Sequence, residues 1–378
     1  MKKIFIYILL ISGPFFILKG QPQTEYLVED ISISTRDNRR LSGTLSIPSS
    51  LEPSSPIVIF VAAPQPVDRN YHGIYSAIAD SLARNGIVSF RFDNRAYVDS
   101  ISTKTNPDKY TMFDSVEDLH DIYTWLRKDK RFTHSPIGLL GHSEGGASCA
   151  IESSQNNEIA FLIVLSTMGL PGSEITFYQS TLPLSYLSGS LDSDQRNSIV
   201  RQIYTTLNII SEYADNDAIE MHLRKYLDDY YTSSPDQKKE FGKLTKDRFI
   251  DTTLKGWMTP RKLCYIKYIP EQYYSKIKCP TLVICGMDDE RIEWKTNLDG
   301  IERIFISNNK HNYRIVGIEG VNHAYEETKG EKIPGFVSVR KKDPNKREWG
   351  KGFQQLNSSI YVWINQLQYP DNHNSPLK

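Results

Sequence analysis

The stretch "GLLGHSEGGAS", residues 138–148, joins a short apolar run to a turn and a series of small side chains. The apolar run is typical of a buried strand, and small residues after it allow a helix to begin close to the sheet. Ser143 lies at the centre of a Gly-x-Ser-x-Gly pattern, in which such a turn strains the backbone. The pattern predicts that the Ser143 hydroxyl stands at the head of the next helix, whose N-terminal amides favour negative charge.

This short pattern also arises by chance, so a nucleophilic role for the serine depends on partners elsewhere in the chain. A serine hydroxyl needs a base, usually an imidazole that a carboxylate holds in one tautomer. His323 follows the apolar stretch 313–320, which predicts that it lies in a loop at the C-terminal end of a strand, where catalytic groups gather in such sheets. Four other histidines fit less well because they lie before the serine, next to it, or at the opposite end of that strand: His120, His134, His142 and His311.

The acid is expected in the segment "LVICGMDDERIE", at the end of the preceding buried strand. Sheets that carry this turn use the chain order serine, acid, histidine. A turn through Gly286 favours Asp289 as the acid, and Asp288 is the alternative. The sequence therefore predicts that Ser143, Asp289 and His323 act together in catalysis.

The charge balance excludes several classes of partner. The chain has 378 residues, with 45 basic and 45 acidic side chains and a net charge of zero, so no nucleic-acid or polyanionic partner is expected. No Cys-x-x-Cys pair occurs, so no zinc site or redox motif is indicated, and we expect no metal or cofactor. Buried free thiols are expected at all four cysteines: Cys149, Cys264, Cys279 and Cys285.

The N-terminal segment "MKKIFIYILLISGPFFILKGQ" has two lysines followed by an apolar run that Gly13-Pro14 interrupts. This arrangement is typical of a bacterial secretory signal peptide, here residues 1–20, with a membrane anchor as the alternative. We therefore expect a secreted or periplasmic protein without stable membrane insertion.

Strands alternate with helices along most of the chain, which predicts an α/β fold with a mostly parallel eight-stranded sheet flanked by helices. Alternating residues at 29–35 and 41–48 predict an opening hairpin. The helix predicted at 114–129 is expected to begin at Asp114 or Ser115 as N-cap. Apolar runs predict buried strands at 56–63, 87–93, 137–140, 161–166, 280–286 and 313–320, and further helices are predicted at 75–86 and 357–368.

Residues 170–275 interrupt this alternation, because they are helix-like and rich in tyrosine. We expect them to form a helical cap over the C-terminal edge of the sheet. The core would then comprise residues 21–169 and 276–367, with a flexible tail at 368–378.

Six segments appear in an order that resembles the α/β-hydrolases: "LSGTLSIP", "VDRN", "RFDNRAYVDS", "GHSEGG", "GMDDERI" and "GVNHAYEE". Across residues 28–366 the chain is similar to secreted bacterial esterases with an inserted cap, which are related to serine aminopeptidase-like hydrolases. In that family Gly-x-x-Asp places the acid, here Asp289, and Gly-x-Asn-His places the base, here His323. The resemblance implies that Ser143 is the nucleophile.

The chain departs from the family after the third strand, where the usual Gly-Ser-Gly-Pro stretch is replaced by "AAPQPVDRN". An oxyanion hole needs one backbone N–H from this loop in addition to that of Glu144. Pro64 and Pro66 have no N–H, so Ala63 or Gln65 is expected to donate. Loss of one donor would slow the reaction about 10²–10³-fold.

A second departure is in "FDNRAYVDS", where the family prefers glycine after the arginine. Tyr97 makes this loop bulkier, and it either narrows the substrate pocket or lies on the surface. In the cap, Tyr178 and Trp257 are candidate substrate contacts because their rings suit aromatic or sugar faces. Packing within the cap is the alternative role for these rings.

These features predict a secreted serine carboxylesterase, of class EC 3.1.1, that cleaves a small-molecule ester through an acyl-enzyme. An aminopeptidase-like amide hydrolase is the alternative, and it would need an acidic subsite from Asp228, Asp229 or Glu240. The altered oxyanion loop motivates a third possibility, a catalytically impaired binding protein. The presence of all three predicted catalytic residues argues against it.

Overall fold

The computed structural model describes residues 26–102, 107–186, 192–233, 241–328 and 349–368. The predicted signal peptide lies outside these residues, as does the predicted tail apart from residue 368. Within the described part of the chain, no helix is long and apolar enough to cross a membrane.

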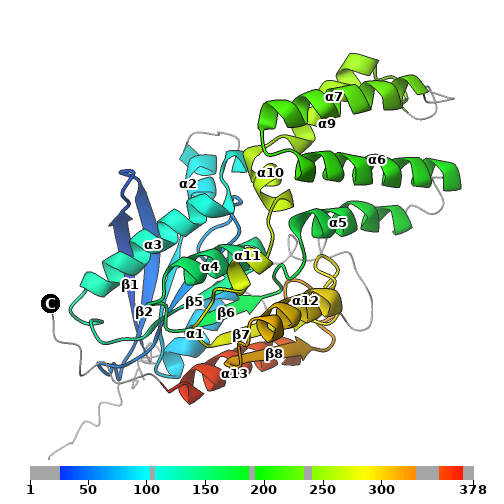
Figure 1. The fold of residues 1–378 in the computed structure, drawn as a ribbon. Helices are drawn as coiled ribbons and strands as arrows, with labels where there is room; N and C mark the ends of the chain where they lie inside the picture. The colour runs from blue at the N-terminus through cyan, green and yellow to red at the C-terminus, as the bar shows by residue number, and fades with distance from the viewer. Residues whose placement is uncertain (1–25, 103–106, 187–191, 234–240, 329–348, 369–378) are drawn as a thin grey trace, which may run out of the picture.

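Eight strands form one sheet in the order β1-β2-β4-β3-β5-β6-β7-β8, which confirms the predicted fold class (Figure 1). The predicted hairpin is formed by β1 and β2, β2 is also antiparallel to β4, and all pairs from β4–β3 to β7–β8 are parallel. The strands are β1 (Tyr26–Ser34), β2 (Arg40–Pro48), β3 (Ile57–Val61), β4 (Val88–Phe92), β5 (Ile137–His142), β6 (Leu162–Leu165), β7 (Thr281–Gly286) and β8 (Tyr313–Ile318).

The central strands are buried along their whole length because helices cover both faces of the sheet. Their apolar runs therefore show no alternation. At the edge of the sheet β8 is largely half-buried, and only Ile318 in it is fully buried. Because the parallel strands share one direction, the residues that follow β3, β5, β7 and β8 meet at one edge.

Two helical layers enclose the sheet (Figure 1). Leu119 of α3, Cys149 of α4 and Ile301 of α12 belong to the apolar cluster on one face. Ile78 of α1 and Ile360 of α13 belong to the cluster on the other. The helices of the two layers are α1 (Ile74–Arg84), α3 (Met112–Lys128), α4 (Glu144–Gln155), α12 (Trp294–Ser307) and α13 (Lys351–Gln366).

The prediction for the start of α3 was wrong by several residues. The helix begins at Met112, because the Thr111 side chain accepts from the Asp114 amide and the Asp114 carboxylate accepts from the Thr111 amide. Asp114 is thus the third helical residue of a capping box, and neither Asp114 nor Ser115 is the N-cap.

Two other helices differ from the sequence prediction. The last helix, α13, begins at Lys351 instead of residue 357, because the buried Phe353 and Leu356 extend its apolar face by more than a turn. The stretch expected to be a loop after β4 contains α2 (Arg95–Ser102), and the Asn94 side chain accepts from the Tyr97 amide in its first turn.

A helical insertion, defined here as residues 170–275, lies between β6 and β7. Its described helices α6, α7 and α9 extend away from the sheet and pack around a separate apolar cluster that includes Leu207, Leu223 and Leu254 (Figure 1). The insertion contains α5 (Gly172–Tyr186), α6 (Ser193–Glu212), α7 (Asn216–Ser233), α9 (Lys246–Trp257), α10 (Pro260–Ile266) and α11 (Glu271–Tyr274).

Several aromatic rings of the insertion contact one another. Tyr231 stacks on Phe241 with ring centroids 4.4 Å apart, and Phe241 lies 4.7 Å from Phe249. Tyr230 also contacts both phenylalanines. These rings have a packing role.

All four cysteines are free. The expectation of buried thiols is correct for Cys149 and Cys285, whereas Cys264 and Cys279 are only partly buried.

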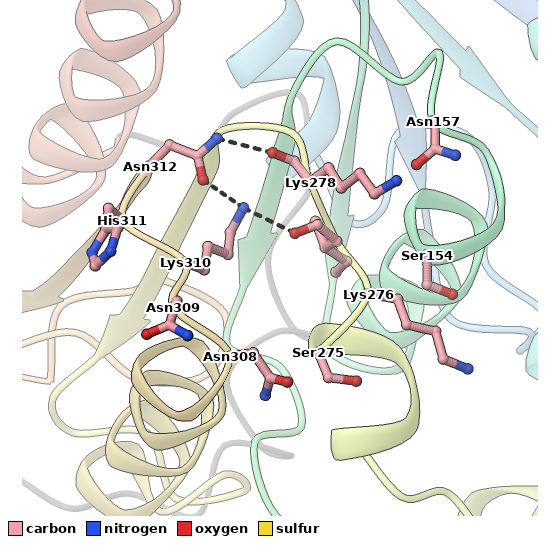
Figure 2. Close-up of a pocket in the computed structure, with 11 residues that line it drawn as sticks. Ser154, Asn157, Ser275, Lys276, Lys278, Asn308, Asn309, Lys310, His311 and Asn312 are labelled. Carbon is pink, nitrogen blue, oxygen red and sulfur yellow. Dashed lines mark hydrogen bonds between the residues drawn. The ribbon is translucent and has the colours of Figure 1, made fainter.

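A cavity of about 650 Å³ opens at the N-terminal edge of the sheet, where the chain enters β7 and β8 (Figure 2). Its lining includes His311 and the buried Lys310. The Lys310 ammonium donates to the carbonyls of Ile277 and Cys279 and to the Asn312 side chain, at 3.2, 2.5 and 2.8 Å. Burial lowers the pKa of Lys310 to about 8. Because these three acceptors engage its ammonium, Lys310 joins the two loops here.

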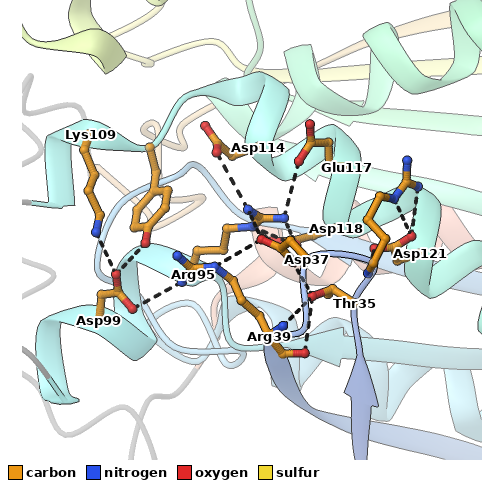
Figure 3. A network of polar contacts seen from close by, with 12 residues as sticks. Thr35, Asp37, Arg39, Arg95, Asp99, Lys109, Asp114, Glu117, Asp118 and Asp121 are labelled. Carbon is orange, nitrogen blue, oxygen red and sulfur yellow. Dashed lines mark hydrogen bonds and ion pairs between the residues drawn. The ribbon is translucent and has the colours of Figure 1, made fainter.

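A polar network connects the β1–β2 turn to α2 and α3 (Figure 3). Arg95, whose side chain is 7% exposed, binds Asp118 of α3 at 2.7 Å and Asp37 of the turn at 2.9 Å. Asp118 is fully buried, and its burial raises its pKa to about 6 even though Arg95 acts in the opposite direction. Arg95 is therefore the counter-charge that makes a buried carboxylate tolerable at neutral pH.

We expect Arg95→Met to lower the free energy of unfolding by about 3–5 kcal/mol at pH 8, because it leaves the Asp118 carboxylate buried and unpaired. The pKa of Asp118 in the folded variant would lie further above its unfolded value, so the folded state would take up a proton as the pH falls. The loss should therefore shrink between pH 8 and pH 5. Chemical denaturation of the variant and the wild-type protein at both pH values measures this loss of stability.

Arg36→Met is the matched control, because Arg36 binds Asp121 at 2.8 Å with a side chain that is 52% exposed. Removing this exposed pair should cost less than about 1 kcal/mol. Equal losses in the two variants would contradict the role given to Arg95.

Candidate active site

Ser143 occupies the sharp turn between β5 and α4 with φ 56° and ψ −127°. Its neighbours on either side are buried, whereas Ser143 itself is partly exposed. A Cβ on Gly141 would lie 2.3 Å from the Gly145 carbonyl oxygen, and one on Gly145 would lie 2.1 Å from that of Val61. Both glycines of the Gly-x-Ser-x-Gly pattern are thus required by close backbone contacts, and the turn presents the Ser143 side chain at the C-terminal edge of the sheet.

His323 and Asp289 form a buried hydrogen-bonded pair at the same edge. The distance from His323 Nδ1 to Asp289 Oδ2 is 2.8 Å, and the amides of Arg291 and Ile292 donate to Asp289 Oδ1 at 2.9 Å each. Burial favours a raised pKa for Asp289, but His323 and the two amides outweigh it and lower the pKa below its usual value. Asp289 is therefore held as a carboxylate that can orient an imidazole.

The neighbouring Asp288 has a different partner. Its carboxylate accepts from the Thr328 hydroxyl at 2.5 Å. Of the two acids that the sequence left open, the one that contacts His323 is Asp289.

His142 links the loop that carries His323 to the turn at Ser143. Its ring centroid lies 4.6 Å from that of His323, and Ser143 is the next residue in the chain. His142 Nε2 lies 2.7 Å from the His323 carbonyl oxygen, which can only accept, so this nitrogen carries the proton. Nδ1 must then accept from the Tyr71 hydroxyl at 2.9 Å. Burial lowers the pKa of His142 to about 3, so its ring is neutral.

The sequence does not predict this supporting role of Tyr71 and His142, because nothing in the spacing of "VDRNYHG" places Tyr71 against the turn at Ser143. From the sequence, His142 is a candidate only for the role of base. Tyr71 has a φ of 45°, which turns the loop after β3 back toward β5.

The loop after β3 limits which amides could complete an oxyanion hole. The Gln65 amide donates to the Ala63 carbonyl at 2.7 Å, so it is engaged within the loop. The Asn94 side chain donates to the carbonyls of Ala63 and Gln65 at 2.9 Å each and fixes their orientation. This contact of the Gln65 amide favours Ala63 over Gln65 as the candidate partner of the Glu144 amide, and the choice between them stays a prediction.

The aromatic candidates are spread over three elements. Tyr97 lies in α2 and Tyr178 in α5, and both are partly buried. The Lys262 ammonium lies 4.6 Å from the centroid of the Trp257 ring, and this ring packs against the apolar cluster of the insertion. A substrate-binding role stays a prediction for Tyr97 and Tyr178, and Trp257 has a packing role in the insertion.

The two described acids among those expected for an amino-group subsite both lie on α7 of the insertion. Asp228 pairs with Lys246 at 2.6 Å, and Asp229 is exposed on the same helix, α7. Glu240 lies outside the described residues. Among the residues that the structure covers, no group of three His, Cys, Asp or Glu side chains could hold a metal ion.

The parallel sheet, the strained serine turn and the buried Asp–His pair define an α/β-hydrolase. Residues 69–324, more than half of the chain and including Ser143, Asp289 and His323, match the family described as serine aminopeptidase, S33. The chain belongs to this family.

Individual relatives are distant. An uncharacterized 31.7 kDa protein of the traX-finO intergenic region of Escherichia coli is 20% identical over 212 residues, which cover 56% of this chain and 65% of that protein. The chain thus matches less than two thirds of the length of this curated relative.

Solved structures with a similar fold include DcsB in complex with its substrate analogue, with a TM-score of 0.51 at 14% identity over 90% of this chain and 99% of that one. The dienelactone hydrolase of Anabaena variabilis has a TM-score of 0.49 at 13% identity, over 90% and 98% of the two chains. Est1E of Butyrivibrio proteoclasticus has 0.47 at 15% identity, over 89% and 97%. At these identities the likeness concerns the fold.

We expect Asp289→Asn to lower the rate of hydrolysis of an activated ester such as p-nitrophenyl acetate by about 10⁴-fold, because asparagine favours the wrong tautomer of the histidine. The matched control is Asp288→Asn, which removes the carboxylate paired with Thr328 and should cost much less. Initial rates of the two variants decide between the acids, and the reverse ranking would move the acid to Asp288.

Proposed function

We propose that the protein is a secreted serine hydrolase that cleaves carboxylic esters through an acyl-enzyme on Ser143. The observation that carries this proposal is the buried Asp289–His323 hydrogen bond beside the strained turn that presents the serine. The Nδ1 atom of His323 is bound to Asp289, so Nε2 is the nitrogen available to the Ser143 hydroxyl.

In the first half of the reaction, Ser143 Oγ attacks the ester carbonyl carbon and His323 Nε2 takes the hydroxyl proton. The carbonyl electron pair moves to oxygen, and the amides of Glu144 and Ala63 are the proposed donors to this oxyanion. When the intermediate collapses, the bond to the alcohol breaks and His323 returns the proton to the leaving oxygen. In the second half, a water gives its proton to His323 and attacks the acyl carbon. When this second intermediate collapses, the bond to Ser143 Oγ breaks and His323 returns the proton to Oγ, which releases the acid and restores both residues.

An amide hydrolase is the second candidate, because the family takes its description from a serine aminopeptidase. An aminopeptidase needs a carboxylate that can pair with the substrate's ammonium group. The candidate acids Asp228 and Asp229 lie on α7, and Glu144, which follows Ser143, is already paired with Arg261 at 2.6 Å. The ester is proposed over the aminoacyl amide because Asp228 is paired with Lys246 and Glu144 with Arg261.

Secretion is part of the proposal and rests on the basic and apolar N-terminal segment. The substrate would then be a small ester outside the cytoplasm, with a short acyl, aromatic or sugar-linked group. Expression of the full chain with its N-terminal segment, followed by fractionation and mass determination of the mature N-terminus, tests this part separately.

We expect Ser143→Ala to abolish hydrolysis of p-nitrophenyl acetate and labelling by a fluorophosphonate probe, because Ser143 is the proposed nucleophile. Ser148→Ala is a matched control, since Ser148 is buried in the same helix and contacts backbone carbonyls. An aminoacyl p-nitroanilide assayed in parallel measures the ester preference.

Undiminished labelling of the alanine variant would mean that a different residue is the nucleophile. A wild-type protein that hydrolyses the anilide faster than the ester would favour the peptidase. A folded protein without either activity would favour the binding-protein hypothesis.

A further inference from the structure

A buried ion pair joins the helical insertion to the turn that carries Ser143. Arg261 of α10 binds the carboxylate of Glu144, the first residue of α4, with 2.6 Å between Nη2 and Oε2. Glu144 is 2% exposed and the Arg261 side chain is 21% exposed. The sequence offered no sign of this contact, since 117 positions separate the two residues.

Burying this ion pair costs free energy. Burial raises the pKa of Glu144, and the charge and hydrogen bond of Arg261 offset only part of that effect. Within the described structure, Glu144 Oε1 and Arg261 Nε are buried without a hydrogen-bond partner. A buried ion pair with unsatisfied atoms contributes little to stability compared with apolar side chains of similar size. Its position beside the nucleophile suggests a role in the reaction.

That role follows from the charge that develops during the reaction. The amide of Glu144 is a proposed donor to the oxyanion, so negative charge forms on the substrate next to this residue. An unpaired Glu144 carboxylate would repel the negative charge that forms on the substrate. At the effective dielectric constant of a protein interior, this repulsion would slow the reaction about 10- to 100-fold. The Arg261 guanidinium cancels that opposing charge.

We propose that Arg261 is a positioning residue of the active site, which holds the Glu144 carboxylate in place and neutralises it beside Ser143. The inference rests on the proposed function. It makes catalysis depend on the docking of α10, because the residue that neutralises Glu144 belongs to the insertion and not to the sheet.

Two other contacts hold α10 in place, one with the core of the protein and one within the insertion. Arg261 Nη1 lies 3.6 Å from Asp108, in the short helix before α3. A Cβ added to Gly172 would lie 1.7 Å from the Tyr265 carbonyl oxygen, so the backbones of α5 and α10 are in direct contact. The guanidinium is therefore held at the turn by the fold of the insertion.

The test compares Arg261→Met, Arg261→Lys and the double variant Glu144→Gln/Arg261→Met. At a pH high enough to keep Glu144 ionised in the variant, we expect Arg261→Met to lower kcat on p-nitrophenyl acetate about 10- to 100-fold with little change in KM, because the uncancelled charge acts mainly on the transition state. At lower pH the loss should shrink, because burial raises the pKa of Glu144 and the unpaired carboxyl takes up a proton. Arg261→Lys should recover much of the loss, since it keeps the positive charge. The double variant should be faster than Arg261→Met, because it removes the uncancelled negative charge as well.

Arg224→Met is the control for loss of an arginine from the insertion. Arg224 pairs with Glu220 at 2.8 Å on α7 and is 49% exposed, so kcat should remain at the wild-type level. Thermal unfolding of every variant shows whether the insertion remains folded.

The inference is overturned if Arg261→Met keeps the wild-type kcat, or if the double variant is no faster than Arg261→Met. The rate of fluorophosphonate labelling separates the inference about Arg261 from the proposed function, because labelling also places a negative oxygen in the oxyanion hole. A protein that labels at Ser143 without hydrolysing esters would fail the proposed function, and its variants would still test Arg261. A wild-type protein that neither hydrolyses nor labels would overturn both.

Discussion

The site depends on a close contact between the first turn of α4 and the end of β3. Gly145 lies so near Val61 that any side chain there would collide with the Val61 carbonyl. This contact brings the loop after β3 beside the head of the helix and leaves Ser143 in a backbone conformation that few residues adopt. The proposed nucleophile, the helix N-terminus and the proposed oxyanion loop are consequently fixed by one backbone contact.

Neutral hydrogen bonds connect the other loops to this turn. His142 accepts a hydrogen bond from the Tyr71 hydroxyl and donates one to the His323 carbonyl, so it joins the loop after β3 to the loop after β8. Since burial keeps His142 neutral, this connection does not change with pH near neutrality. The thiol of Cys285 lies 3.7 Å from the Asp289 carboxylate, which adds a weak contact beneath the acid. The Asp289–His323 pair is thus supported from the sheet as well as from the loops.

The insertion has a different relation to the site. Many of its described apolar side chains pack around its own cluster, and aromatic rings within it contact one another, so its outer helices form a separate body of helices. Arg261 is a point where its charge reaches the serine turn. In the cavity at the opposite edge, the Lys310 ammonium is instead occupied by three acceptors of the surrounding loops. These contacts favour the C-terminal edge as the place of the proposed site.

The sequence by itself determined the order and type of the strands along the chain and the serine turn, and it predicted a histidine at 323 and an acid at 289 or 288 as the partners of Ser143. Those features depend on local patterns: apolar runs that form buried strands, glycines on either side of Ser143, and polar residues directly after β7 and β8. The start of α3 escaped prediction because two residues, Thr111 and Asp114, satisfy each other's backbone amides.

Only the tertiary structure decided which amide of the proline-containing loop is engaged, that Tyr71 reaches His142, and that Arg261 faces Glu144. Each of these is a contact between segments far apart in the chain, and its energy depends on burial and direction. Neither the burial of these groups nor the direction of their hydrogen bonds can be read from the spacing of residues. Both arise when the sheet brings the loops to one edge and the insertion folds back onto it.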